Sequence, residues 1–329
     1  MAEYKDIHGT NIETVTSDPS NPVVGQMWYN STSRTLKGFI LSPASWASGG
    51  NINSDGHFQA GGAGIQTAGL IAGGGTQWPG VGVTDNTETY NGSSWTEVNN
   101  LNEAKRNLSG LGLTTAALVC GGGPPAKVDT ETWNGTSWTE VNNLNTAKDN
   151  GPGVTGILTA GIAFAGEGAP GAKLANAETF NGTSWTEVGD LNTARFALGA
   201  AGTYTACLGF GGSADSPADG GEVESWNGTS WTEIADLNTN GREGVSGFGS
   251  QTSALASGGS TANVELWNGS SWAEQNNLPA ILSNKGPAQN SPGSLGMVAG
   301  GFYGPGINVV QTTYEWTGET ESTITFDVS

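Results

Sequence analysis

Positively charged residues are scarce in this chain of 329 residues. Lysine and arginine together number 11 against 30 aspartates and glutamates, so the net charge is −19. Nucleic acids and anionic membrane surfaces are bound by clusters of lysine and arginine, whereas the basic residues here stand singly or in pairs. We therefore expect neither a nucleic acid nor a membrane surface as a partner.

Long apolar runs are also missing. None approaches the roughly 18 residues that a membrane-spanning helix needs, and the opening MAEYKDIHGT has no positive region followed by an apolar one. We expect no membrane insertion and no secretory signal.

Cysteine and histidine are nearly absent. Cys120 and Cys207 lie in apolar stretches of different repeats, and the two histidines are His8 and His57. Free cysteine packs as a small apolar residue, so we expect two buried thiols in a protein made in a reducing cytosol. A zinc site takes three or four ligands in local spacing. Because no such set is present, we expect no metal and no cofactor.

Acidic residues are numerous, but they do not form a catalytic pair. Most glutamates recur at two places in an internal repeat: Glu88, Glu131, Glu178, Glu224 and Glu265 before a turn, and Glu97, Glu140, Glu187, Glu233 and Glu274 after it. A catalytic residue has no reason to recur in every repeat, so we interpret these as structural. The acids outside the pattern are Asp85, Asp129, Asp149, Glu167, Asp215, Asp219 and Glu243. Several fall in variable loops, where a calcium or sugar contact is conceivable, but no calcium-loop spacing is present. We expect no enzymatic activity.

Glycine and tryptophan are abundant, with 54 and 12 copies, and they follow the repeat. Each intact copy has an aromatic residue, Asn-Gly, two small hydroxyl residues and Trp; the leading aromatics are Tyr90, Trp133, Phe180, Trp226 and Trp267. A degenerate sixth copy contains Trp316, and successive copies lie 41 to 49 residues apart. An apolar run ending in glycine precedes each copy.

Each repeat predicts four short strands, which lie after segments such as LNTAR, in the apolar run, before Asn-Gly and after it. Four strands in about 45 residues is the period of a β-propeller blade. We interpret the glycine pairs as allowing crowded strands to approach and the aromatic residues as filling the wedge between sheets. The predicted fold is all-β, a six-bladed β-propeller of four-stranded antiparallel blades, with seven blades as the alternative and a short β-hairpin as an N-terminal extension.

Closure of the ring is predicted to use the start of the propeller segment. Trp46 and the Asn-x-Asn after it match the outer strand of a repeat that has no inner strand before it. We expect Trp46 to open an outer strand donated to the last blade. The C-terminal STITFDVS could fill the same place, and a seventh partial blade arises if both segments are strands.

The Asn-Gly segments have two readings. They are acceptors for N-glycosylation, a modification that needs a secretory pathway for which the sequence gives no sign. Asn-Gly is also favoured in two-residue type I′ hairpin turns, because both residues there take positive φ. We expect type I′ turns, followed directly by the strand that carries Trp.

The double glycine, the aromatic residue and the Trp resemble the kelch repeat from about Trp46 to the C-terminus. The chain departs from that pattern by a shorter spacing from the aromatic residue to Trp. The resemblance implies a propeller and leaves the function open among oxidases, scaffolds and adhesive modules. A copper-radical oxidase of this type would need paired His and Tyr ligands and a cross-linking Cys, which this chain does not readily supply.

Loops between the glycine-ended run and the next strand vary in length and content, while the turn and the strand after it barely vary. Variation on one face of a regular scaffold is typical of a binding surface. The residues expected to contact a partner are Trp78, Pro79, Lys127, Asp215, Phe302 and Tyr303. The aromatic residues of these loops would stack on sugar rings; alternatively, they fold back onto the protein itself and fill space there.

A different segment, residues 1–41, precedes the propeller segment 42–329. Its pattern P-x-x-G-Q-x-W-Y-N-S-T-S-x-x-L-K contains Trp28 and Tyr29. The pattern is similar to segments near the N-termini of fibre and appendage proteins of tailed phages, marine phages in particular. That resemblance implies that Trp28 and Tyr29 dock the chain to a virion; the alternative is an ordinary β-hairpin.

Together these features predict a non-enzymatic virion structural protein: a tail fibre, an appendage or a capsid decoration. Its N-terminal segment would contact other virion proteins, and its propeller would attach to a host surface glycan or a neighbouring virion protein. We expect synthesis in the host cytoplasm and location in the virion, and we leave homo-oligomerisation open. The alternatives are a cellular kelch-type adhesin or scaffold at the cell surface, and a carbohydrate-active propeller enzyme.

Overall fold

The structure is a computed structural model that describes residues 12–77, 82–213, 220–283, 286–303 and 308–326. The chain divides into two compact units, Met1–Ser45 with Gly318–Ser329, and Trp46–Thr317. Across the described ranges every regular element is a β-strand, which confirms the all-β class, and no helix there is long and apolar enough to cross a membrane. The predicted boundary at residue 41 assigned the C-terminal segment to the propeller, whereas it belongs with the N-terminal unit.

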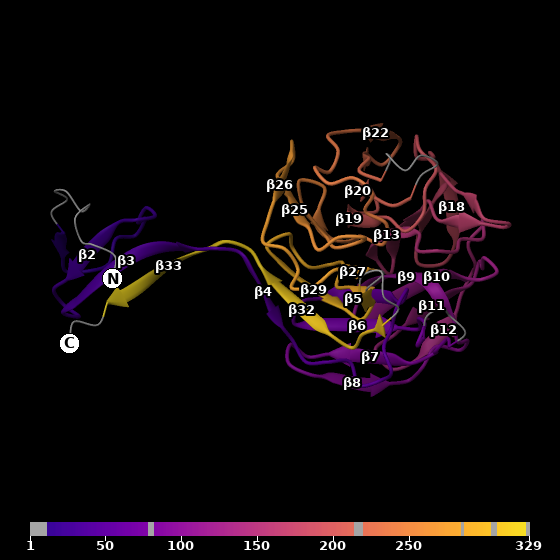
Figure 1. Cartoon of the computed structure of the whole chain (residues 1–329), viewed down its shortest axis with the longest axis horizontal. Helices are drawn as coiled ribbons and strands as arrows, with labels where there is room; N and C mark the ends of the chain where they lie inside the picture. Colours follow the sequence, from indigo (N-terminus) through magenta and orange to yellow (C-terminus); the bar gives the residue numbers. More distant parts are fainter. Residues whose placement is uncertain (1–11, 78–81, 214–219, 284–285, 304–307, 327–329) are drawn as a thin grey trace. The chain divides into compact units, whose positions relative to one another are not determined.

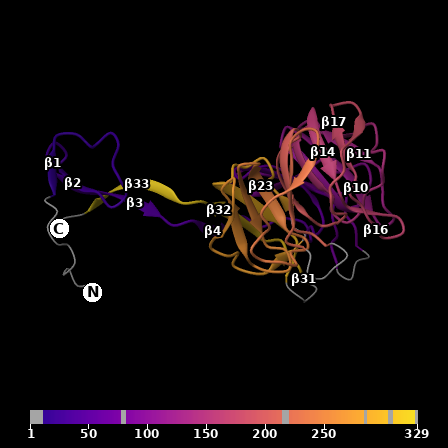
Figure 2. The ribbon, with the colours of Figure 1, turned by 90° about the horizontal axis from the view of Figure 1, so that it is seen from above.

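The first unit is a four-stranded sheet in the order β1 (Glu13–Val15), β2 (Met27–Asn30), β3 (Thr35–Ser42) and β33 (Thr320–Phe326). Strands β2 and β3 form the predicted hairpin. Strand β33 pairs with β3 in antiparallel register from Leu36↔Phe326 to Ser42↔Thr320 (Figure 2). The STITFDVS segment therefore completes this sheet and does not close the propeller.

The second unit contains, among its described residues, six four-stranded sheets, one for each glycine-ended run of the sequence (Figure 1). The first three, innermost strand first, are β5 (Gly61–Ile65), β6 (Ala68–Ala72), β7 (Thr87–Tyr90) and β8 (Trp95–Val98); β9 (Arg106–Leu113), β10 (Ala116–Gly123), β11 (Thr130–Trp133) and β12 (Trp138–Glu140); and β13 (Gly153–Ile157), β14 (Ala160–Phe164), β17 (Ala177–Phe180) and β18 (Trp185–Val188). The next three are β19 (Gly199–Thr203), β20 (Ala206–Phe210), β21 (Val223–Trp226) and β22 (Trp231–Glu233); β23 (Ser246–Ser250), β24 (Ser253–Ser257), β25 (Val264–Trp267) and β26 (Trp272–Glu274); and β28 (Gly286–Pro287), β29 (Leu295–Ala299), β32 (Thr313–Thr317) and β4 (Ser45–Ser48).

Short strands in the loops make two further small sheets. They are β15 (Glu167–Gly168) with β16 (Ala172–Lys173), and β27 (Leu282–Ser283) with β30 (Phe302–Tyr303) and β31 (Asn308–Val309). Strands β15 and β16 follow the second strand β14, and β30 and β31 follow the second strand β29, in connections where the repeats differ in length; β27 lies between β26 and β28.

The innermost strands make the sheets a closed ring. Strands β5, β9, β13, β19, β23 and β28 neighbour one another in that order, and β28 returns to β5. Glycine permits the approach, because a Cβ on Gly62 would lie 2.5 Å from the carbonyl oxygen of Pro287. The glycine pairs after the second strands also permit close approach, because a Cβ on Gly73 would lie 2.8 Å from the carbonyl oxygen of Lys105. Gly73 and Gly74 have φ of 64° and 108°, so they supply a left-handed turn in addition.

Closure follows the predicted route through Trp46. Strand β4 is the fourth strand of the sheet β28–β29–β32–β4, and the rings of Trp46 and Trp316 lie 5.2 Å apart. Intact repeats pair the aromatic residue and the Trp that flank Asn-Gly in the same way, as Tyr90 with Trp95 at 5.0 Å. Trp46 therefore takes, in the last sheet, the place of the Trp that follows Asn-Gly elsewhere.

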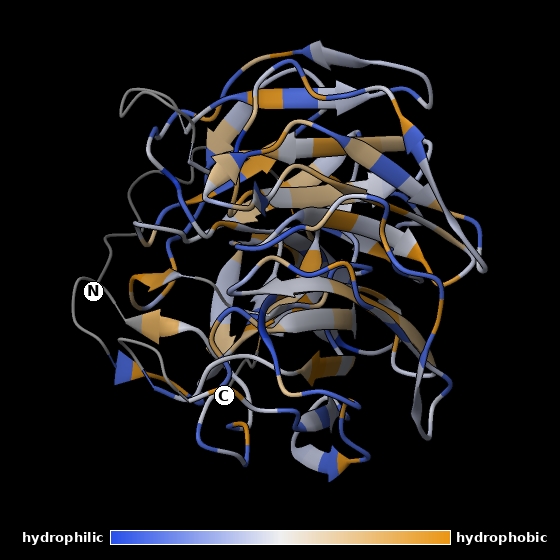
Figure 3. Cartoon of the chain, turned by 90° about the vertical axis from the view of Figure 1, so that its right-hand side faces the viewer, coloured by the Kyte–Doolittle hydropathy of each residue, from blue (hydrophilic) through white to orange (hydrophobic). Residues whose placement is uncertain are grey.

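These aromatic pairs lie between neighbouring sheets, as predicted. Trp133 and Trp138 pack against Leu70 and Ala72 of the preceding sheet, and the indole N–H of Trp138 donates to Thr87 Oγ1 of that sheet at 3.0 Å. Apolar segments accordingly lie along the strands and hydrophilic residues dominate the connections (Figure 3).

The predicted type I′ turns are wrong. Strands β7 and β8 pair at Tyr90↔Trp95, so four residues form the turn. Gly92 has φ of 90°, whereas none of the turn asparagines is among the described non-glycine residues with positive φ. The Asn91 Oδ1 instead accepts the backbone N–H groups of Ser93 and Ser94, at 3.0 and 2.9 Å. The asparagine is thus selected as a side-chain acceptor and glycine alone for positive φ.

Candidate binding site

A buried glutamate joins each of five neighbouring pairs of sheets. The glutamates are Glu88, Glu131, Glu178, Glu224 and Glu265, each on a third strand and at most 1% exposed. Each accepts two hydrogen bonds, from the backbone N–H and the Nδ2 of an asparagine that follows the outer strand of the previous sheet; these asparagines are Asn53, Asn102, Asn145, Asn192 and Asn238. The structural role expected of this glutamate set is confirmed. Their cross-strand partners after the turn, such as Glu97 and Glu140, are exposed.

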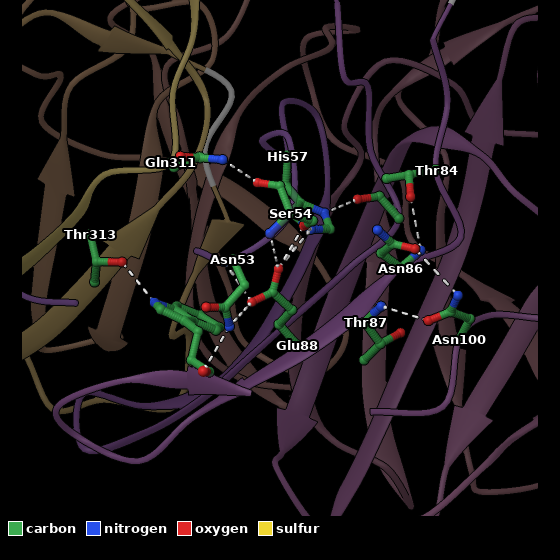
Figure 4. A network of polar contacts seen from close by, with 12 residues as sticks. Asn53, Ser54, His57, Thr84, Asn86, Thr87, Glu88, Asn100, Gln311 and Thr313 are labelled. Carbon is green, nitrogen blue, oxygen red and sulfur yellow. Dashed lines mark hydrogen bonds and ion pairs between the residues drawn. The ribbon is translucent and has the colours of Figure 1, made fainter. Parts of the chain in front are cut away.

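The junction at Glu88 closes the ring, because Asn53 follows β4 and Glu88 lies on β7 (Figure 4). Ser54 donates from both its backbone N–H and its hydroxyl to Glu88 Oε1, at 2.9 and 2.6 Å. His57 donates through Nδ1 to the carbonyl of Gly73, and its Nε2 lies 3.8 Å from Glu88 Oε1. Burial raises the pKa of Glu88, but the neighbouring His57 and the hydrogen bonds from Ser54 and Asn53 outweigh it and lower that pKa to about 2.

A buried basic residue follows each of these asparagines by three or four positions. The five are His57, Lys105, Lys148, Arg195 and Arg242, at most 2% exposed. Arg242 Nη1 lies 3.1 Å from Glu265 Oε1, and Lys105 Nζ lies 2.9 Å from Glu131 Oε1. Lys148 instead donates to the Asn176 Oδ1 and carbonyl, at 2.8 and 3.0 Å. We call one glutamate, its asparagine and its basic residue a clasp.

The sixth junction departs from this pattern. The repeat places Tyr314 where the glutamate stands elsewhere, and Pro279 where the asparagine stands. Tyr314 is 6% exposed. The seam between β26 and β32 therefore joins its sheets without the carboxylate–amide contact of the other five.

Directly after each basic residue of a clasp, the chain places a residue whose chemistry varies among the sheets, from aromatic to cationic to acidic. These residues are Phe58, Arg106, Asp149, Phe196 and Glu243. We call them the variable ring. Backbone bridges join Phe58 to Gly75, Asp149 to Glu167 and Phe196 to Ser213. The variable ring therefore lies beside the loops that follow the second strands, on the face where sequence variation predicted binding.

The residues that directly follow the variable-ring residues lie around the entrance of the central channel. We call this entrance the mouth. Gln59, Asn107, Asn150 and Ala197 have φ between 53° and 62°, and Gly244 has φ of 72°. Their backbones are linked from sheet to sheet, since Ala197 N–H donates to Asn150 O at 2.9 Å and Gly244 N–H to Ala197 O at 2.8 Å. Backbone hydrogen bonds therefore connect three neighbouring sheets at the mouth.

The channel below the mouth narrows to a cavity of about 60 Å³ between the first strands. A water molecule needs roughly 10–15 Å³ of such space, so the cavity admits a few waters and no sugar ring. Gln59 and Gln289 line it. A larger ligand must therefore lie across the mouth.

Polar side chains at the mouth are connected across three sheets. Gln59 Nε2 donates to Asn150 Oδ1 at 3.3 Å, and Asn150 Nδ2 donates to Glu167 Oε2 at 3.0 Å. Asn107 Nδ2 donates to Asp149 Oδ1 at 2.7 Å. Burial raises the pKa of Asp149, and the hydrogen bond from Asn107 opposes it.

Two positively charged side chains lie over the phenyl groups of variable-ring residues. The guanidinium carbon of Arg106 is 5.7 Å from the centre of the Phe58 ring, and Lys173 Nζ is 5.7 Å from that of Phe196. Phe302, a predicted contact residue, packs edge-on against Phe58 with ring centres 6.3 Å apart. Phe302 thus belongs to the same site as Arg106.

The other predicted contact residues are distributed unevenly. Lys127 lies in the loop after β10 and pairs with Glu103 and, at 3.9 Å, with Asp129, while its backbone bridges Lys148 of a clasp. Tyr303 lies on β30 opposite Leu282. Trp78, Pro79 and Asp215 lie outside the described residues.

The variable ring was missed by sequence reasoning. Its signal was available, because the residue after the repeated basic position can be compared among repeats. Segments such as LNTAR predict where a first strand begins, but alone they do not align His57, Lys105 and Lys148 with Arg195 and Arg242 as one position. Asp149, Glu167 and Glu243 were noted only as acids outside the repeat.

Trp28 of the N-terminal unit is not available to a docking partner in this fold. It is fully buried and its indole N–H donates to Asp18 at 3.0 Å. Asp18 also accepts from Asn30 at 2.7 Å and pairs with Lys37 at 2.6 Å, and these contacts lower its pKa to about 2. Tyr29 keeps partly exposed surface, and its docking role stays a prediction.

The two cysteines are buried and free. Burial raises the pKa of Cys120 to about 12 and raises that of Cys207 as well, so neither is a thiolate nucleophile at neutral pH. Within the described ranges, no group of three or more His, Cys, Asp or Glu residues could hold a metal ion.

Comparison with known proteins supports the fold alone. No family model matches the chain, and no curated protein matches it. Among solved structures, one titled "Structure of YjhT" matches with a TM-score of 0.65 and 12% identity, covering 83% of this chain and 99% of that one. The chain is thus a β-propeller protein in architecture, with the N-terminal unit in addition.

Proposed function

We propose that this chain is a non-enzymatic structural protein of a tailed-phage virion, in which the propeller is the recognition part. The observation that carries the proposal is the contrast within each repeat. The glutamates and basic residues of the clasps are buried and recur from sheet to sheet, whereas the variable ring beside them carries two aromatic residues, one cation and two acids. A scaffold needs the first set only. Phe58 of the second set is fully buried, whereas Arg106, Phe196 and Glu243 keep exposed surface and are available for binding.

The N-terminal unit supports a separate attachment role. Both ends of the chain enter its sheet, since β3 and β33 pair over seven residues. The propeller is therefore connected to this unit through two segments of the chain, one between β3 and β4 and one between β32 and β33. The similarity of the segment around Trp28 and Tyr29 to phage fibre and appendage proteins adds the virion as the attachment partner, in a tail fibre, an appendage or a capsid decoration.

The partner of the propeller is a host surface glycan or a neighbouring virion protein. The low count of basic residues, 11 in 329, argues against nucleic acid as that partner. The described residues offer no clustered metal ligands, and the repeated glutamates are used in clasps, so a binding role fits better than a hydrolytic one.

Analysis of purified phage particles tests the proposal. Mass spectrometry should find the chain in particles purified by density gradient, and electron cryomicroscopy should place a propeller on the tail or capsid. Recovery of the chain from the host envelope, and its absence from particles, would favour a cellular kelch-type adhesin instead.

A further inference from the structure

Hydrogen-bonding groups without a partner lie at the mouth and along the cavity below it. The Oδ1 of Asn107 and the Oε1 atoms of Gln59 and Gln289 are buried acceptors that have no hydrogen-bond partner among the described residues. Nε and Nη1 of Arg106 are buried donors in the same condition. Asn107 and Gln289 are 7% and 8% exposed. Because leaving a polar group buried and unpaired is unfavourable, this cluster points to a ligand or to bound water.

The mixture of donors and acceptors restricts the chemistry of that ligand. A single ion can satisfy groups of one kind only, whereas a hydroxyl group both donates and accepts. The cluster spans neighbouring sheets: Arg106 stacks on Phe58, Gln59 reaches Asn150, and Asn107 reaches Asp149. A compound with several hydroxyl groups on a rigid frame matches such a set.

Charge at the mouth disfavours a strongly charged ligand. Asp149 and Glu167 are backbone partners, and the whole chain carries −19, so an anion would be repelled. Arg106 and Lys173 lie on the same side of the propeller, over rings of the variable ring, so the mouth is not purely acidic either. A neutral polar ligand avoids both repulsion by the acidic residues and repulsion by Arg106 and Lys173.

We propose that the mouth binds a neutral saccharide, whose hydroxyl groups hydrogen-bond Arg106, Asn107 and Gln59 directly or through water. This inference rests on the proposed function and names its ligand class. The cavity of about 60 Å³ excludes a sugar ring, so the ring lies across the mouth with waters bridging to Gln59 and Gln289. The partly exposed rings of Phe196 and Phe302 supply apolar surface for the faces of the sugar.

Ligand-observed saturation-transfer NMR on the full chain tests this. The probes are neutral oligosaccharides (lactose, maltohexaose and cellohexaose), with heparin oligosaccharides and chitosan oligomers as the charged comparison. We expect saturation transfer to at least one neutral sugar, and binding weaker by about tenfold or more in Arg106→Ala, since hydrogen bonds to charged groups contribute about 1.5–3 kcal/mol. Glu140→Gln, on the exposed end of β12, is the control that should bind as the original chain does.

Folding of the variants is checked by thermal unfolding, and Arg106→Lys keeps the charge while removing Nε and the planar group. Sugar binding lost in both Arg106 variants with unfolding unchanged supports the proposal. Equal binding by all variants, preference for the charged sugars, or binding of a peptide or protein and no sugar would overturn it. If the chain binds no sugar but is found in virions, the saccharide proposal fails and the virion role stands. If the chain binds sugar but is absent from virions, only the virion role is overturned.

Discussion

Trp46 and Trp316 pack with ring centres 5.2 Å apart and an interplanar angle of 49°, although 269 residues separate them in the sequence. Trp46 also donates its indole N–H to the Asn276 carbonyl at 3.1 Å. One strand from near the start of the chain thereby completes the sheet formed by its end, and closure of the ring depends on this contact.

Replacement of Trp46 should therefore weaken the whole propeller. We expect Trp46→Ala to lower the free energy of unfolding by about 2–4 kcal/mol, somewhat less than for a fully buried Trp, because the side chain is only partly buried. Denaturant unfolding followed by tryptophan fluorescence measures it. Tyr204→Ala, at an exposed position, is the control. Equal unfolding midpoints for the two variants would contradict the role of Trp46 in closing the ring.

The clasps should be far more sensitive than the glutamates opposite them. Glu265 and Glu274 are cross-strand partners, but Glu265 is fully buried against Arg242 at 3.1 Å while Glu274 is exposed. Removing one partner of a buried ion pair costs about 3–5 kcal/mol, so Glu265→Gln should destabilise by that order and Glu274→Gln by less than about 0.5 kcal/mol. Similar effects of the two substitutions in calorimetry would show that the clasp is not structural.

Lys148 gives a pH dependence with a definite sign. Burial lowers its pKa to about 8, opposed by Glu178, whereas an unfolded lysine titrates near 10.4. Between these values the unfolded chain binds more protons than the folded one, so stability due to this group rises with pH. The difference in unfolding free energy between the original chain and Lys148→Met should therefore shift in favour of the original chain by up to about 3 kcal/mol between pH 8 and 10.5. Chemical denaturation at several pH values measures this, and a constant difference would contradict it.

The revised turn geometry predicts which residue tolerates change. Gly182 has φ of 92°, a conformation that costs a residue with a Cβ about 1–3 kcal/mol. Gly182→Ala should destabilise by that order, and Thr183→Ala, in the same exposed turn, should be nearly neutral. Thermal unfolding compares them; a neutral Gly182→Ala would contradict the turn geometry.

Repetition made most of the fold predictable. Trp after Asn-Gly marks the fourth strand of each intact sheet. The matching Trp46 near the start of the propeller segment was enough to predict that its strand completes the last sheet. The turn type could not be read from Asn-Gly, because the same dipeptide serves a two-residue turn and a four-residue turn with a side-chain acceptor. The partner of β33 was not predictable either, since Ile324 and Phe326 alternate as in any edge strand and pairing with β3 is a long-range choice.

The candidate site was harder to predict because it depends on contacts between repeats. Arg106 and Asp149 lie 43 residues apart in the sequence and carry no motif of their own. Only the ring of sheets brings them to one mouth, where Asn107 bridges to Asp149. Variable loops indicated the correct face, but the residue that varies inside the regular part of the repeat was overlooked.

Adsorption of the purified full chain to host cells of the proposed phage tests the central claim most directly. We predict that Arg106→Ala and Glu243→Gln, both in the variable ring, reduce the bound fraction by about tenfold or more, while Glu140→Gln and Glu187→Gln on the outer strands leave it unchanged. Equal adsorption by all four variants, or loss only in the outer-strand variants, would contradict the assignment of recognition to the mouth of the propeller.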